Sequence, residues 1–195
     1  MSNNNLTKEA ELIYDLICSV GSVTTSQVKR VLSNTRSNPE NLVKSLCRMR
    51  YTKWIGENYS IPYYTSKINK GSIYCLWAML DLISDENGNL AIEKLQNIIE
   101  GNGIAQFSYI QNDNTVVNMV YLTASDNAKV AASTQRFYDY SGAKKGEEKS
   151  AGIVYLFVTC SEEMAVKVKE SNLNYPHKIA FLSGDIDNNP VIKFL

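Results

Sequence analysis

Histidine is the scarcest of the side chains that build catalytic and metal sites: the 195 residues include one, His177, next to Pro176. The four cysteines lie far apart and form no CxxC pair. A Ser-His-Asp triad or a His/Cys zinc site needs partners that this chain does not supply. The sequence therefore predicts neither kind of site, and we expect His177 to be a surface residue of a turn.

Long apolar runs are missing as well. The longest, Ile73–Leu80, has 8 residues, whereas a helix that crosses a bilayer needs roughly 20. The first five residues, Met1 to Asn5, contain neither the basic nor the apolar region of a signal peptide. We therefore expect no membrane span. Because unpaired cysteines suit a reducing compartment, we predict a cytoplasmic protein.

Motifs that hold phosphates, cofactors or metal ions are incomplete or absent. Gly101-Asn-Gly103 lacks the third glycine of a dinucleotide fingerprint, and no GK[ST] loop occurs. The segment from Asp185 to Asn189 resembles the start of a calcium loop, but Pro190 stands where that loop needs glycine. The sequence therefore predicts no cofactor and no metal site.

The net charge is zero overall, yet it is distributed unevenly along the chain. Residues 1–72 carry ten Lys and Arg against five Asp and Glu, a net charge of +5, and residues 73–195 carry the opposite excess, −5. Contacts to phosphate dominate the affinity of proteins for nucleic acid. The basic third is therefore the candidate nucleic-acid-binding region.

Two short helices are expected at the start of this basic third. The first has apolar residues at helical spacing from Leu6 to Val20, and Gly21 is placed to end it. The second begins after Thr24 or Thr25, because threonine is a good N-cap. The residues expected to point outward from the second helix are Lys29 and Arg30.

A third helix begins at Asn38-Pro39, with asparagine as the N-cap and proline at the first helical position. Its predicted inner face contains Leu42, Val43, Leu46 and Met49. Its predicted outer stripe contains Asn41, Lys44, Ser45 and Arg48. Asparagine and arginine can read base edges in the major groove, and lysine and serine can reach phosphates. A merely solvated helix face would show the same pattern, so the stripe alone leaves both interpretations open.

The segment after the third helix favours the DNA-binding interpretation. Trp54-Ile55, a turn at Gly56-Glu57-Asn58 and a strand at Tyr59–Ile61 predict a β-hairpin, which Pro62 ends. Three short helices followed by a hairpin predict a winged helix-turn-helix, whose hairpin is the wing. The basic residues that flank the third helix and the hairpin are Arg36, Arg50, Lys53, Lys67 and Lys70.

Residues 73–195 predict a second domain of mixed α/β structure, so that the chain as a whole is α+β with domains at 1–72 and 73–195. We expect a buried helix at 73–83, an ambiguous, helix-like segment at 90–100, and strands at 105–110 and 115–122 that form a hairpin. A helix at 124–140, a loop at 141–150, a buried strand at 153–158, a helix from Ser161 or Glu162, and strands at 178–182 and 191–194 complete the domain.

One arrangement of acidic residues resembles a nuclease site. Metal-dependent nucleases place an Asp near a hairpin and a Glu-x-Lys on the next strand, where the carboxylates hold Mg²⁺. Here Asp113 lies in the hairpin turn and Glu147-Glu148-Lys149 precedes the strand at 153. Because this Glu-x-Lys falls in a charged loop and a helix intervenes, we expect a protein without enzymatic activity, with a divalent-metal nuclease as an alternative.

The order of parts resembles a known family. The stretch LTKEAELIYDLI…VTTSQVKRVL…NPENLVKSLCRMRY…WIGENYSIPYY, followed by a small α/β domain, resembles winged-helix proteins of the replication-relaxation type from plasmids and conjugative elements of Gram-positive bacteria, and related families of unknown function. The resemblance implies a second domain that is restriction-endonuclease-like without an active site. It covers residues 6–64, and no catalytic residue carries over.

The sequence thus predicts a DNA-binding accessory or regulatory protein of a mobile genetic element, with double-stranded DNA as its partner. The residues expected to contact DNA are Arg36, Asn41, Lys44, Ser45, Arg48, Arg50, Lys53 and Lys67. Winged helices also serve as protein-interaction modules, so an adaptor that docks an acidic protein partner is the first alternative. The sequence indicates no oligomeric state.

Overall fold

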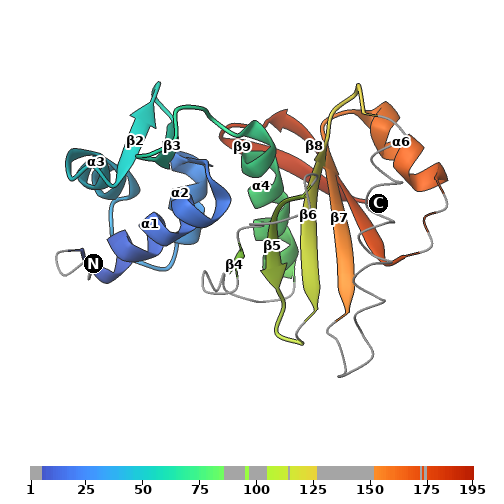
Figure 1. Ribbon diagram of the computed structural model, residues 1–195, viewed down its shortest axis with the longest axis horizontal. Helices are drawn as coiled ribbons and strands as arrows, with labels where there is room; N and C mark the ends of the chain where they lie inside the picture. Colours follow the sequence, from blue (N-terminus) through green and yellow to red (C-terminus); the bar gives the residue numbers. More distant parts are fainter. Residues whose placement is uncertain are drawn as a thin grey trace.

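A computed structural model describes residues 6–85, 95–96, 105–113, 115–126, 152–171, 173 and 175–195 (Figure 1). The chain is an α+β protein, and these residues form two β-sheets. The elements before residue 86 are α1 (Lys8–Val20), β1 (Val23–Thr24), α2 (Thr25–Val31), α3 (Pro39–Arg48), β2 (Thr52–Ile55), β3 (Tyr59–Pro62) and α4 (Lys70–Asp85). Those after it are β4 (Leu95–Gln96), β5 (Ala105–Ile110), β6 (Val116–Leu122), β7 (Ile153–Thr159), α6 (Glu162–Glu170), β8 (His177–Asp185) and β9 (Asn189–Phe194).

The first helix begins and ends at the residues that its sequence predicts. The Thr7 hydroxyl accepts a hydrogen bond from the Ala10 N–H at 3.2 Å, which satisfies one of the free donors of the first turn. Gly21 ends the helix with φ 83°, a left-handed conformation that glycine adopts at little cost. The apolar stripe, including Ile13 and Ile17, is buried.

The next two helices also follow their predicted caps. Thr24 and Gln27 form a capping box at the start of α2: each side chain accepts a hydrogen bond from the other residue's N–H, at 3.2 and 2.9 Å. The Asn38 side chain caps α3 by accepting from the Asn41 N–H at 3.2 Å, with Pro39 at the first position.

Strands β1, β3 and β2 form a small antiparallel sheet in that spatial order. The β2–β3 hairpin pairs Thr52 with Pro62 at its base and Ile55 with Tyr59 next to its turn. The chain therefore runs α1-β1-α2-α3-β2-β3, and the predicted hairpin directly after the third helix is confirmed.

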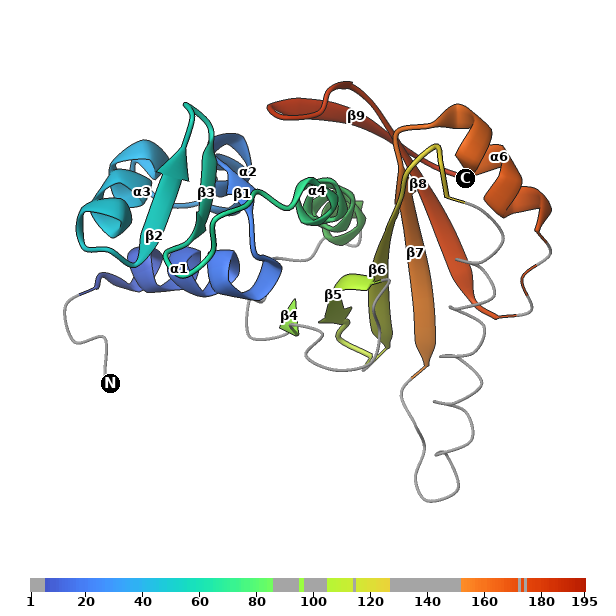
Figure 2. The ribbon, with the colours of Figure 1, turned by 45° about the horizontal axis from the view of Figure 1, so that its top comes forward.

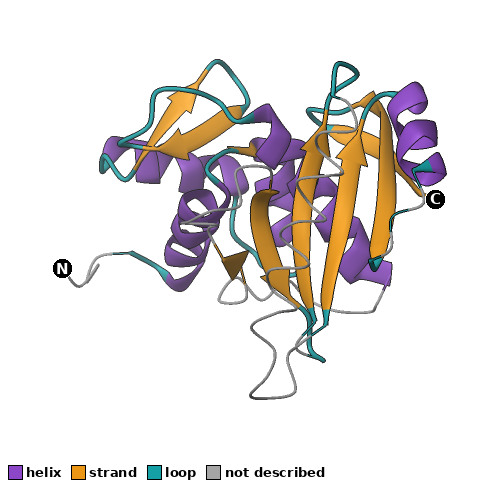
Figure 3. Cartoon of the chain, turned by 45° about the vertical axis from the view of Figure 1, so that its right-hand side comes forward, coloured by secondary structure: helices purple, strands orange, loops and turns teal. Residues whose placement is uncertain are grey.

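The second sheet has six strands in the order β4-β5-β6-β7-β8-β9. The three central strands β6, β7 and β8 are parallel to one another, and the outer neighbours pair antiparallel. Helix α4 packs on one face of the sheet, between it and the N-terminal elements (Figure 2). Helix α6 packs on the opposite face, against β7 and β8 (Figure 2 and Figure 3), where Met164 and Val168 are buried in one cluster with Phe157 and Ile179.

One buried apolar cluster extends from the N-terminal helices to the second sheet. It contains Leu16 of α1, Trp77 of α4, Phe107 of β5 and Leu156 of β7. The domain boundary predicted between residues 72 and 73 lies within α4, which begins at Lys70. That boundary stays a prediction, and the core is continuous across it.

Polar contacts fix the N-terminal elements against α4. The buried Gln27 side chain donates to the Ile73 carbonyl oxygen at 2.7 Å, and the Asn69 N–H donates to the Ser22 hydroxyl at 2.8 Å. Removal of one partner of such a buried hydrogen bond lowers the free energy of unfolding by about 1–3 kcal/mol. These contacts give α4 and the N-terminal elements a defined relative orientation.

The expectation that Arg30 points outward from the second helix is wrong, because its side chain contacts α4. Its guanidinium pairs with Asp81 of α4 at 2.5 Å and lies over the Trp77 ring, 5.9 Å from the centroid. The pair is about one third exposed on each side. Arg30 is therefore part of the contact between α2 and α4 and is not available to a ligand in this arrangement.

Three smaller expectations also change. Met49, expected on the inner face of the third helix, is 41% exposed because the helix ends at Arg48. His177 is the first residue of β8 and is half-buried against aromatic rings. Leu95–Gln96, within the segment expected to be helix-like, pairs with β5 as a strand.

Of the remaining secondary-structure predictions for the second half, the helix expected from Ala124 is wrong at its start, because Ala124 and Ser125 form a turn. The hairpin of β5 and β6, the buried strand β7, and the helix after Ser161 are all present. Most of the predicted helix at 124–140, the loop at 141–150, Glu147 and Lys149 lie outside the described residues. No helix within the described part of the chain is long and apolar enough to cross a membrane.

Candidate nucleic-acid interface

The predicted polar stripe of α3 lies on the outer side of that helix. Asn41, Lys44 and Arg48 are exposed and Ser45 is half-buried, while Val43 on the opposite side is fully buried. The helix is amphipathic because its apolar residues recur at spacings of three and four. Three of the four predicted residues are therefore accessible to a ligand.

Lys44 is accessible but has neighbours of its own. Its ammonium lies 3.4 Å from a Glu40 carboxylate oxygen, one turn earlier, and 5.3 Å from the centroid of the Trp54 ring. Both members of the ion pair are well exposed, and such surface pairs stabilise a protein by about 0–1 kcal/mol. A phosphate could therefore replace Glu40 as the partner of Lys44 at small cost.

The end of α3 carries two arginines, Arg48 and Arg50, that are separated by one residue. The Arg50 N–H donates to the Cys47 carbonyl at 3.1 Å and the Tyr51 N–H to the Leu46 carbonyl at 3.0 Å, the paired hydrogen bonds of a Schellman motif. Arg50 adopts φ 61° there, the left-handed conformation that this motif usually gives to glycine. Arg48 and Arg50 are both exposed at this end.

The base of the β2–β3 hairpin adjoins this end of α3. The Lys53 ammonium donates to the Thr65 carbonyl at 2.9 Å and lies 5.1 Å from the Tyr63 ring centroid. The Tyr63 N–H donates to the Tyr51 carbonyl at 3.2 Å, which continues the hairpin beyond its last strand pair. Lys67 follows in the same segment and is exposed.

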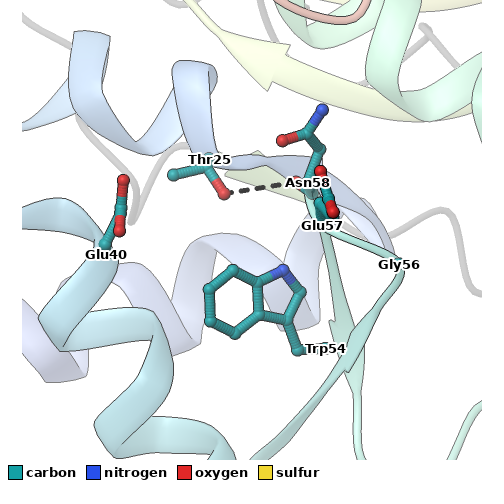
Figure 4. Close-up of a pocket in the computed structure, with 6 residues that line it drawn as sticks. All are labelled: Thr25, Glu40, Trp54, Gly56, Glu57 and Asn58. Carbon is teal, nitrogen blue, oxygen red and sulfur yellow. Dashed lines mark hydrogen bonds between the residues drawn. The ribbon is translucent and has the colours of Figure 1, made fainter.

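The tip of the hairpin has the opposite character. A cavity of about 320 Å³ lies beside it, with carboxylates of Glu40 and Glu57 on its walls and the Trp54 ring between them (Figure 4). Asn58 connects the tip to the start of α2, because its carbonyl accepts hydrogen bonds from the Thr25 N–H at 2.9 Å and from the Thr25 hydroxyl at 3.3 Å. The tip is therefore held against α2 and carries negative charge.

The turn between β8 and β9 lies next to this tip. The Ser26 hydroxyl donates to the Asn188 side-chain oxygen at 3.4 Å, and the Tyr59 hydroxyl donates a hydrogen bond to the Asp187 carboxylate. That hydrogen bond, together with burial, raises the pKa of Tyr59 to about 12. Asp185 holds the turn by accepting from Asn188. Two further carboxylates therefore stand at the tip of the hairpin.

The eight predicted contact residues thus fall into separate groups. We call the end formed by the α3 terminus and the hairpin base the basic end; it contains Arg48, Arg50, Lys53 and Lys67. Asn41, Lys44 and Ser45 continue from it along α3. Arg36 is exposed in the loop before α3, at the other end of a helix about 15 Å long.

The candidate nuclease residues are placed only in part. Asp113 is exposed in the β5–β6 turn, where the Thr115 N–H donates to its carboxylate at 2.9 Å and lowers the pKa of that carboxyl group. This is the ordinary role of an aspartate in a turn. Within the described residues, no three His, Cys, Asp or Glu side chains gather in a group that could hold a metal ion.

Two tyrosines at the basic end were not among the predicted contact residues. Tyr63 is 44% exposed and Tyr64 is 76% exposed. The signal available in the sequence was an aromatic pair placed directly after Pro62 and between Lys53 and Lys67. Periodicity could not reveal their exposure, because they lie outside any regular helix or strand.

Comparison of the chain with protein-family models, with curated proteins and with solved structures found no match.

Proposed function

We propose that residues 6–65 form a winged helix that binds double-stranded DNA, and that the chain is an accessory or regulatory protein of a mobile genetic element. The observation that carries the proposal is the basic end, where four cationic side chains flank an amphipathic third helix. The element order α1-β1-α2-α3-β2-β3, with β3 between β1 and β2 in the sheet, supports the winged-helix interpretation. The resemblance of residues 6–64 is the support for the mobile-element role.

Helix α3 is the element that enters the major groove. Asn41 and Arg48 are on its exposed side and have the side chains that can bond bidentately to adenine and guanine edges. Arg50, Lys53 and Lys67 lie beside the C-terminal end of the helix and contact the phosphates that border the groove. Lys44 exchanges Glu40 for a phosphate oxygen when DNA binds.

The DNA approaches from the basic end and leaves the hairpin tip free. Three carboxylates, those of Glu57, Asp185 and Asp187, stand around that tip and would repel a phosphate backbone. The wing of this protein therefore acts through its base. Its tip fixes the orientation of the second half of the chain.

We propose that the second half is a non-catalytic body with a restriction-endonuclease-like arrangement. Its mixed sheet with parallel central strands between α4 and α6 supports this interpretation. The single described candidate for metal binding, Asp113, is used as a turn cap. Contacts of Gln27 and Arg30 with α4 make this body a rigid support for the DNA-binding elements.

A salt series tests the proposal. Fluorescence anisotropy of a labelled duplex is measured from low to physiological salt with the wild type, Arg48→Ala and the control Lys169→Ala, an exposed lysine of α6. We expect Arg48→Ala to weaken binding by about 5- to 150-fold, the equivalent of about 1–3 kcal/mol. The control should bind as the wild type does.

The wild-type affinity should fall linearly with salt on logarithmic axes, with a slope of about −3 to −4 for four phosphate contacts. Absence of duplex binding at low salt would refute the proposal. In that case recovery of an acidic protein partner would favour the adaptor alternative.

A further inference from the structure

Two exposed tyrosines lie at the basic end. Tyr64 is 76% exposed and Tyr63 is 44% exposed. Among the residues that the structure describes, they are the only aromatic side chains with large exposed apolar area. Exposed aromatic rings next to cations are the usual platform on which unpaired bases stack.

The segment that carries these tyrosines is held at several points. The Tyr63 N–H donates to the Tyr51 carbonyl at 3.2 Å, and Thr65 donates twice to the Pro62 carbonyl, from its N–H at 3.1 Å and its hydroxyl at 3.0 Å. Lys53 adds a hydrogen bond to the Thr65 carbonyl at 2.9 Å. The backbone that carries the two rings is therefore held in place, which reduces the entropy lost on binding.

Cations and one carboxylate set the limits of this surface. The Lys53 ammonium lies 5.1 Å from the Tyr63 ring centroid, and Lys67 is exposed three residues after Tyr64. Arg50 is also exposed and precedes Tyr51, whose carbonyl accepts from the Tyr63 N–H. Burial, and then the Cys18 thiol of α1, raise the pKa of Tyr64, so the Tyr64 hydroxyl lies near α1. Asp15 of α1 also interacts with Cys18. A phosphate backbone would therefore follow the lysines and keep away from α1.

We propose that Tyr63 and Tyr64, flanked by Lys53 and Lys67, bind unpaired bases of single-stranded DNA, so that the protein prefers a junction where a duplex opens into single strands. The inference rests on the proposed function for the duplex part of that junction. Helix α3 holds the paired arm, and the tyrosine pair, a few residues beyond the hairpin base, stacks on the first unpaired bases.

Three labelled DNA probes of one sequence test the proposal: a blunt duplex, a forked duplex with unpaired thymidine arms, and the single strand. We expect the wild type to bind the fork about 5- to 150-fold more tightly than the blunt duplex, the range for one stacked base. Tyr64→Ala should remove most of this preference and leave blunt-duplex affinity unchanged. Tyr64→Phe should retain it, because the ring remains. Val191→Ala, 66% exposed in β9, is the remote control.

Each outcome separates this inference from the proposed function. Equal binding of fork and blunt duplex, with the duplex affinity still dependent on Arg48, would overturn the tyrosine platform and leave the proposed function standing. Single-strand binding that Tyr64→Ala abolishes, without duplex binding, would support the platform and refute the proposed function. Binding of no probe refutes both. Tighter binding of a single-stranded RNA of the same sequence would overturn the assignment to DNA.

Discussion

The two ends of the β2–β3 hairpin differ in charge, in attachment and in the residues around them. The base carries Arg48, Arg50, Lys53 and Lys67, and Tyr63 and Tyr64 are exposed beside it. The tip carries Glu57, borders Glu40, and is bonded to α2 and to the β8–β9 turn. A hairpin of two four-residue strands thus separates a cationic surface from an anionic one.

This difference shows why the composition of a region is a weak guide to its binding surface. The excess of +5 over residues 1–72 is concentrated at one end of the hairpin, because Arg30 is paired with Asp81 and Lys44 with Glu40. Two acidic residues of the second half, Asp185 and Asp187, lie at the hairpin tip because the β8–β9 turn contacts it. The electrostatic potential is therefore positive at the base of the hairpin and negative at its tip. Such a potential favours approach of a phosphate backbone from the base.

Reversal of one charge at each end of the hairpin should produce the largest difference in duplex affinity. Arg50→Glu places a carboxylate at the basic end, and we expect duplex affinity to fall by more than about tenfold. Glu57→Lys, the matched reversal at the tip, should cause no loss. Anisotropy titrations at one salt concentration measure both. A greater loss for Glu57→Lys than for Arg50→Glu would reverse our assignment of the two ends.

Removal of Lys53 should have a smaller effect with a distinct signature. Lys53→Ala deletes one phosphate contact, so affinity should fall severalfold and the salt slope should decrease in magnitude by about 1. Lys178→Ala, an exposed lysine of β8, serves as the control. If Lys53→Ala has the same salt slope as the wild type, the Lys53 ammonium of the wild-type complex remains bonded to Thr65 and contacts no phosphate.

Arg50 offers a way to separate binding from folding. Because Arg50 adopts φ 61° at the end of α3, Arg50→Gly should stabilise the fold by about 0.5–1 kcal/mol while it weakens DNA binding. Urea unfolding measures the first effect and anisotropy the second. Loss of stability together with loss of binding would show that Arg50 is retained for the fold.

The smallest effect concerns the attachment of the tip. The pKa of Tyr59 is raised from about 10 to about 12 by its hydrogen bond to Asp187 and by burial. The protonated Tyr59 hydroxyl therefore makes its full contribution to the free energy of unfolding below pH 10. This contribution is lost as the pH rises from 10 towards 12. Tyr59→Phe should remove this part of the alkaline destabilisation, measured as the change in urea midpoint between pH 9 and about 11. An identical change in both proteins would contradict the attachment.

Local signals predicted the N-terminal elements well, since each is specified by residues close in sequence. Thr24 and Asn38 cap the helices that the sequence assigns to them, and the hairpin turn falls at Gly56. The partner of Arg30 could not be predicted, because Asp81 lies 51 positions away. Leu95–Gln96 has apolar and polar residues that suit either state, and its pairing with β5 decides for a strand.

The sequence predicts which basic residues belong to the candidate site, but it does not predict how the charged groups are arranged around the hairpin. The basic residues are where the chain order places them, yet the sequence does not reveal that Glu40, Glu57 and the β8–β9 turn gather at the hairpin tip. That arrangement depends on contacts between residues more than 100 positions apart, such as Ser26 and Asn188. The position of the β8–β9 turn therefore determines which end of the hairpin is covered.

Site-specific photo-cross-linking tests the central claim, that DNA lies against the basic end, most directly. A benzophenone amino acid replaces either Met49, uncharged and 41% exposed between the two arginines, or Glu57 at the tip. We expect irradiation with labelled duplex DNA to give a covalent adduct at position 49 and none at position 57. An adduct at position 57 alone, or at neither position, would contradict the account.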